Sequence, residues 1–203
     1  MTTSRGSAVK NAQLDQEEIT TGVSPLLRGY NGTMPANADA ALSGNTLLGL
    51  GTLPSDWMAA ASAGSKAKSG VWTMTGQAAA GAGTAMTFFR LYDSTGTTCH
   101  RQGNLGVAVP LSTSALTAAN SNVLNFASTT GVAVGQNVTG AGIPTNATVL
   151  AFTATTVTMS HASTAGVANA ASITFGYDMT IDNASVAVSQ VINVNTYSIT
   201  AGN

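Results

Sequence analysis

The sequence predicts an all-β protein with a β-sandwich or jelly-roll-like main domain, a short N-terminal helix or arm, and an inserted small β-domain. Three observations predict this class: short alternating apolar and polar runs recur between Gly, Asn and Pro turn signals, one stretch before Pro25 has a helical pattern, and the composition changes after Pro110. The alternative is a single continuous β-sandwich. The predicted parts are an N-terminal arm and helix (1–25), a main β-domain (26–110 and 178–203) and an inserted β-module (111–177).

The N-terminal part opens with a basic, Ser/Thr-rich arm and continues into a helix expected from about Ser7 to Thr21. Gly22, followed by a Ser-Pro pair, is a helix stop signal. Because the helix is short and weakly apolar, we expect it to need a partner surface to persist. We therefore predict that this segment, from Met1 onward, is an anchoring arm held by an assembly surface or a neighbouring subunit.

The stretch YNGTMPANADAALSGNTLL, Tyr30–Leu48, is expected to be a structured crossover between two strands. The letters LLRGY before it and TLLGLGTL at its end have strand patterns. Inside the stretch, Pro35 and Asn37 predict a turn, and ADAAL is interpreted as a single helical turn. Two glycines in the second strand, Gly49 and Gly51, indicate a bulge or a close approach of two backbones.

The segments after this crossover predict a loop, a strand and a hairpin. SAGSKAKSG, which carries Lys66 and Lys68, is expected to be a flexible loop. VWTMTGQ is a strand with Trp72 and Met74 on one face, and GTAMTFFRLYDSTGTTCHRQGNLG is the clearest hairpin signal, with its turn at Asp93–Gly96. Four large side chains are predicted in the core of the main domain: Trp57, Trp72, Phe88 and Phe89.

The inserted module differs in composition from its flanks. From Leu111 to Gly176 there is no Lys, Arg, Asp or Glu. The segment consists of short Val/Thr/Phe/Ile runs with strand patterns: NVLNFAS, QNVTGAGIP, ATVLAFTATTVTMS and ASITFG. From Asp178 the earlier style resumes with two alternating strands.

Charge and cysteine content limit the possible functions and compartments. Charged residues make up 7% of the 203 residues, the net charge is −1, and no Lys or Arg follows Arg101. This argues against nucleic-acid binding, which needs a clustered basic surface. No run is long and apolar enough for a membrane span, and the N-terminus has no apolar secretory core. One cysteine rules out an intramolecular disulfide and fits a reducing cytosol. Such a chain is expected to be a component of a large assembly.

No catalytic, cofactor-binding or metal site is expected, and we interpret the protein as a non-enzyme. Cys99 and His100 are adjacent, so a strand would point them to opposite faces, and His161 is the only other histidine. No zinc spacing, G-x-S-x-G elbow, dinucleotide loop or phosphate loop is present. Three acidic residues are expected at turns and strand edges: Asp93, Asp178 and Asp182.

Three segments resemble a known family. YNGTMPANADAALSGNTLL, FFRLYDSTGTTCHRQGNLG and VINVNTYSITAGN are similar to successive segments of small structural proteins of tailed bacteriophages, the head decoration or cement proteins. The resemblance covers residues 7–110 and about 178–203. The insert resembles a β-rich module found in various phage surface proteins, and it interrupts the family pattern.

The resemblance implies a virion protein that binds the outside of the assembled capsid as a homotrimer and stabilises contacts between major capsid subunits. It implies synthesis in the cytoplasm of a bacterial host and a place on the capsid exterior. Its implied partners are the major capsid protein and other copies of itself, with no nucleic acid, membrane or cofactor. Two alternatives stay open: a phage tail, head-fibre or spike component that contacts the host, and a carbohydrate-binding β-module.

Overall fold

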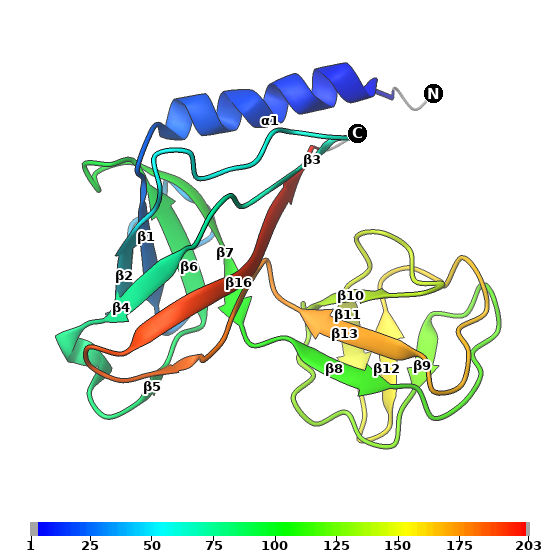
Figure 1. The fold of residues 1–203 in the computed structure, drawn as a ribbon. Helices are drawn as coiled ribbons and strands as arrows, with labels where there is room; N and C mark the ends of the chain where they lie inside the picture. The colour runs from blue at the N-terminus through cyan, green and yellow to red at the C-terminus, as the bar shows by residue number, and fades with distance from the viewer. Residues whose placement is uncertain (1–3, 202–203) are drawn as a thin grey trace. The chain divides into compact units, whose positions relative to one another are not determined.

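A computed structural model describes residues 4–201, and Figure 1 shows its fold. The chain is mostly strand with one short N-terminal α-helix, α1 (Ser7–Thr21), which confirms the predicted all-β class and the predicted helix. It folds into two units, each compact in itself. The first unit holds the chain up to Gly106 and again from Met179, and the second is Val107–Asp178. The first three residues of the predicted arm lie outside the described residues.

The first unit is built on a seven-stranded barrel. Its strand order is β14-β7-β6-β1-β2-β4-β16, and pairing between β14 and β16 closes the sheet on itself. All pairs are antiparallel except β14 with β7. The strands are β1 (Leu26–Tyr30), β2 (Leu47–Thr52), β4 (Thr73–Gly76), β6 (Phe88–Tyr92), β7 (Cys99–Gly106), β14 (Met179–Ile181) and β16 (Val191–Thr200).

Strand β16 makes the closure possible because its ten residues pair with three strands in turn. Its first part pairs with β4, its middle with β14, and its end with β3 (Ser65–Ala67). The main domain is therefore one closed sheet, where the sequence pattern had favoured a sandwich or jelly-roll-like arrangement. Three short elements complete the unit: the 3₁₀ helix η1 (Ala78–Ala80), β5 (Thr84–Ala85) and β15 (Ser185–Val186).

The barrel interior holds most of the predicted core aromatics. Trp57, Trp72 and Phe89 belong to one buried cluster, in which Trp72 meets Trp57 and Tyr197 at tilted angles and Phe89 meets Tyr197 edge to face. Phe88 is also fully buried, but it stacks on Tyr30 outside that cluster, with ring centroids 5.3 Å apart. The prediction that these aromatics are core residues is thus confirmed, and the two phenylalanines point to opposite faces of β6.

The glycines of β2 allow two backbones to approach closely, as the sequence predicts. A Cβ atom at Gly51 would lie 1.9 Å from the carbonyl oxygen of Thr73. No L side chain fits there without moving β4, the strand that pairs with β2. The glycine at this position is therefore required by barrel packing.

The segment SAGSKAKSG is not a flexible loop, so that prediction is wrong. It contains strand β3, which pairs with the end of β16, and Lys66 at its centre is only 3% exposed. The buried ammonium is stabilised by two carboxylates of α1, Asp15 and Glu18. Because both carboxylates are distant from Lys66 in the sequence, the local composition of SAGSKAKSG gives no sign of them and is typical of a loop.

The second unit consists of two three-stranded antiparallel sheets, β10-β13-β8 and β11-β12-β9. Its own core includes Phe126 and Phe175, whose rings meet edge to face at 5.5 Å. Pro110, which the sequence analysis places in the main domain, lies in β8 and pairs with Thr174 of β13. The strands are β8 (Val109–Ser112), β9 (Val123–Asn125), β10 (Asn137–Gly140), β11 (Val149–Phe152), β12 (Thr156–Met159) and β13 (Ser172–Gly176).

Within residues 4–201, no helix has the length and apolar character that crossing a membrane requires.

Candidate functional site

Two cavities of the first unit gather its polar side chains, and they lie on different sides of the β6–β7 hairpin. One lies between α1 and the barrel, with a volume of about 360 Å³, and the other lies under the Tyr30–Leu48 crossover, with about 390 Å³. His100 lines the first cavity and Cys99 the second. The prediction that these neighbours point to opposite faces is therefore confirmed.

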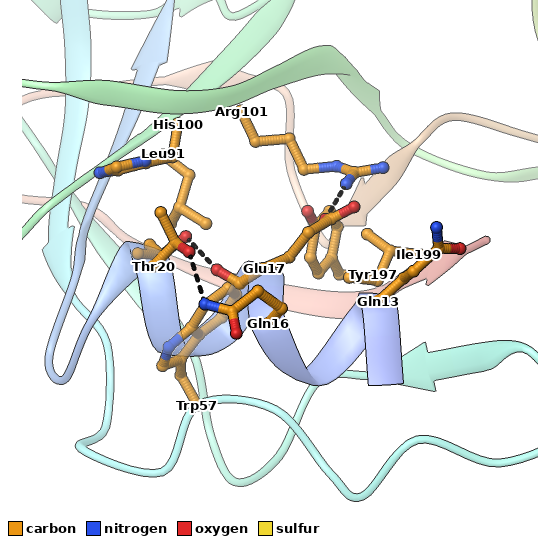
Figure 2. A pocket seen from close by; sticks show the side chains of 11 residues that line it. Gln13, Gln16, Glu17, Thr20, Trp57, Leu91, His100, Arg101, Tyr197 and Ile199 are labelled. Atoms are coloured by element: carbon orange, nitrogen blue, oxygen red, sulfur yellow. Dashed lines mark hydrogen bonds and ion pairs between the residues drawn. The ribbon is translucent and has the colours of Figure 1, made fainter. Parts of the chain in front are cut away.

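The α1 cavity is bounded by the helix on one side and by β7 and β16 on the other (Figure 2). Glu17 reaches across it to Arg101, with 2.5 Å between the carboxylate and guanidinium atoms. Both side chains are roughly half exposed, so this pair contributes at most about 1 kcal/mol. Gln13, Gln16 and His100 add polar groups to the wall, and Tyr197 adds an aromatic ring.

An ion-pair set centred on the buried Lys66 ammonium fixes α1 on the same end of the barrel. The Lys66 ammonium lies 2.5 Å from Asp15 Oδ1 and 2.6 Å from Glu18 Oε2. Burial lowers the pKa of Lys66, but hydrogen bonds and charges from the two carboxylates outweigh it, so the pKa is raised above 10.5. Lys66 therefore stays charged across the physiological range.

Neutral contacts continue this attachment along the helix. The backbone N–H of Gly64 donates to Asn11 Oδ1 at 2.9 Å. At the other end, Trp57 Nε1 donates to the carbonyl of Gly22 at 3.0 Å, just after the last helical residue. The chain's own barrel thus provides a partner surface for this helix, where the sequence analysis expects an assembly surface or a neighbouring subunit.

The crossover is held against the hairpin by one arginine. Arg90 is 3% exposed, and its Nη2 donates to the carbonyls of Ala38 and Ala40 while its Nε donates to Cys99 Sγ at 3.2 Å. Gln102 Nε2 adds a bond to the Pro35 carbonyl at 2.6 Å. Backbone carbonyls of this stretch thus accept hydrogen bonds from a buried guanidinium. The stretch therefore has a structural role, which is to hold the shape of the crossover.

The turn in the crossover forms where the sequence predicts it. The side-chain oxygen of Asn37 accepts hydrogen bonds from the backbone N–H groups of Asp39 and Ala40, at 3.0 and 2.9 Å. The helical turn expected at ADAAL is absent, and a tight turn stands in its place. The Asn37 side chain thus accepts hydrogen bonds from backbone N–H groups that a helical turn would have included.

Two arginines face each other across β1 and β6, and an aromatic ring lies beside both. Arg28 pairs with Arg90 in the strand register, and their guanidinium carbons lie 4.3 and 5.7 Å from the Tyr92 ring centre. Arg28 Nε is buried without a hydrogen-bond partner among the described residues, and the Tyr92 ring face lies beside this guanidinium. Burial, followed by a hydrogen bond with Tyr92, raises the pKa of Tyr30 to about 12.

Cys99 is not set up as a nucleophile. Burial raises the pKa of its thiol above 9.0, and the nearby Arg90 charge only partly opposes this. A reactive cysteine needs a lowered pKa and access to solvent. The thiol instead accepts a hydrogen bond that orients Arg90.

The remaining candidate residues have structural surroundings. Asp93 accepts hydrogen bonds from the Thr95 hydroxyl and the Thr97 backbone N–H in the hairpin turn, and Asp182 accepts from the backbone and side chain of Asn193. Asp178 immediately precedes β14, and His161 shares a hydrogen bond with Ser160 at 2.9 Å. In the part of the chain that the structure describes, no three His, Cys, Asp or Glu residues gather to hold a metal ion.

Sequence reasoning missed the Lys66 ion-pair set and the buried role of Arg90. One signal was available: Asp15 and Glu18 are three residues apart in a helix, which places both carboxylates on one face toward a shared cation. Nothing local indicated which lysine would meet them. Arg90 bonds mainly to backbone carbonyls, which sequence patterns do not distinguish.

Comparison of the chain with protein-family models, with curated proteins and with solved structures found no match.

Proposed function

We propose that this protein is a capsid decoration, or cement, protein of a tailed bacteriophage. In this role it binds the exterior of the assembled shell as a homotrimer and ties major capsid subunits together. The three segments that resemble the decoration family support the proposal, and two of them meet in one structural feature. The Tyr30–Leu48 crossover packs on the β6–β7 hairpin through Arg90 and Gln102.

The observation that carries the proposal is a weakly charged surface with exposed aliphatic side chains. Lys66 and Arg90, two of the seven cations, are buried in contacts within the first unit. Large apolar side chains lie open instead, and burying them against a capsid subunit would contribute favourable free energy to binding. The most exposed are Val71, Ile19 and Val23 in the first unit, and Leu116, Val134 and Leu150 in the second.

The mechanism is thermodynamic and needs no chemical step. A ligand that binds only the assembled state stabilises that state by mass action. With few charges available, the contacts to capsid subunits are apolar or formed by main-chain strand pairing. The same binding therefore depends weakly on ionic strength.

The experiment that tests this role is binding of the purified protein to shells stripped of their decoration. We expect cosedimentation with expanded shells and none with unassembled capsid subunits. Equal binding to both, or none to either, would contradict the proposal. Binding to host cells or to polysaccharide instead would favour the tail-component or carbohydrate-binding alternatives.

A further inference from the structure

Helix α1 is attached to the barrel by ion pairs as well as by the neutral contacts described above. Each of its three carboxylates pairs with a barrel cation: Asp15 and Glu18 with Lys66, and Glu17 with Arg101. Its only buried side chains are those of Leu14 and Thr21. A helix of fifteen residues is marginal by itself, so its persistence depends on these docking contacts.

Helix α1 buries less of its apolar surface than an ordinary surface helix, whose apolar stripe faces the core. Here the carboxylates turn toward the barrel, while Val9 and Ile19 are 53% and 70% exposed. Beside the helix lies the cavity of about 360 Å³, which is open to solvent, so part of the helix surface that faces the barrel is not packed against it. The apolar part of the docking rests mainly on Leu14, which is 1% exposed and belongs to the core cluster of the first unit.

The segment that joins α1 to β1 has the features of a hinge. Gly22 has φ 85° and Ser24 has φ 50°, so both lie in the left-handed region. Val23 between them is 68% exposed, and a Cβ at Gly22 would meet nothing within 4 Å. A few such residues suffice to absorb the dihedral changes of an opening movement.

We propose that α1 is a latch that opens as a unit about residues 22–24 while the barrel stays folded. In the closed state the Asp15–Lys66–Glu18 set and the Glu17–Arg101 pair hold it. Opening uncovers the cavity wall, including His100 and Tyr197, and frees Leu14 from its buried site. Because the closing contacts include ion pairs whose carboxylates are partly exposed, added salt weakens these pairs and shifts the equilibrium toward the open state. This device does not rest on the proposed function.

Three other ionisable groups lie on or near α1: Lys10, Arg5 and His100. Lys10, on the helix itself, packs its aliphatic stem against Gly64 beside β3. Arg5 donates to Gln13 within the N-terminal segment and makes no ion pair with the barrel among the described residues. His100 lines the cavity from the barrel side. Lys66 and Arg101 are the barrel cations whose ion pairs with α1 the described residues show.

Hydrogen exchange followed by mass spectrometry on the full chain tests the latch. In the unaltered protein, we expect the opening that exposes α1 amides to cost less free energy than the opening that exposes β6 amides. Raised salt should speed hydrogen exchange of the α1 amides and leave that of the β6 amides unchanged. Asp15→Asn with Glu18→Gln leaves Lys66 without counter-charges, and we expect α1 exchange to rise at least about tenfold with β6 unchanged. The matched control is Asp39→Asn with Asp56→Asn, which removes two charges from exposed loop positions. It should leave hydrogen exchange of both the α1 and the β6 amides unchanged.

A charge exchange provides a second variant that preserves the buried set. Arg101→Glu should speed α1 exchange, and adding Glu17→Arg should restore it. The latch is overturned if α1 and β6 exchange through one common opening in the unaltered protein at low and high salt. A carboxylate variant that fails to fold would also overturn it, because the helix would then be inseparable from the barrel.

Discussion

Phe89 packs edge to face against Tyr197 inside the barrel, with ring centroids 5.6 Å apart, and is 1% exposed. Phe89→Ala would leave a cavity that the closed sheet cannot easily collapse. We expect the free energy of unfolding to fall by about 3–5 kcal/mol, measured by urea denaturation. Phe152, 44% exposed in the second unit, is the matched control, and its alanine variant should cost far less. Equal effects would place Phe89 outside the core.

Asp93 gives the hairpin turn a defined acid sensitivity. The Thr95 hydroxyl, followed by the backbone N–H groups of Thr97 and Thr98, lowers the pKa of Asp93 from 3.8 to about 2. A lowered pKa contributes stability that is present above about pH 4 and is lost as pH falls through about 2. The stability difference between the unaltered protein and Asp93→Asn should therefore shrink between these values. A constant difference from neutral pH down to pH 2 would contradict this account.

At the scale of elements, Arg90 couples the crossover to the hairpin. A lysine at this position keeps the charge but loses the fork that reaches two carbonyls and a thiol. We expect Arg90→Lys to destabilise the first unit by about 1–3 kcal/mol and to speed amide exchange at residues 38–42. Arg5→Lys, at an exposed site, is the control. Unchanged exchange in the crossover would show that Arg90 does not hold it.

Local signals explain which elements could be predicted. Helix α1 has the predicted bounds because Gly22 and Pro25 mark its end in the sequence itself. The alternation of β4 and the β6–β7 hairpin are likewise local patterns. Strand β3 was missed because Lys66 is stable there only through α1 carboxylates about fifty residues away.

At the scale of the whole molecule, barrel closure was beyond sequence patterns. Closure depends on β14 pairing with β16 on one side and with β7 on the other, and β7 is separated from β14 by the entire second unit. Both sheet arrangements bury the same alternating residues, so the hydrophobic pattern does not separate a barrel from a sandwich. The α1 cavity follows from this closure and could not be predicted without it.

The same pairing makes the second unit removable. Leu105 of β7 lies beside Met179 of β14, so the two points where the chain leaves and re-enters the barrel are adjacent. Replacing 107–178 by a short Gly/Ser linker should leave a folded barrel, with its unfolding free energy changed by about 2 kcal/mol or less. Circular dichroism during urea denaturation checks this. An unfolded product would show that the barrel requires the second unit.

The proposal that this protein covers the capsid exterior is tested most directly by its copy number in the particle. Quantitative mass spectrometry of purified virions, calibrated on the major capsid protein, gives this ratio. The account predicts a copy number comparable with that of the major capsid protein and set by the shell lattice. A handful of copies per particle would contradict it and would place the protein in the tail or a spike.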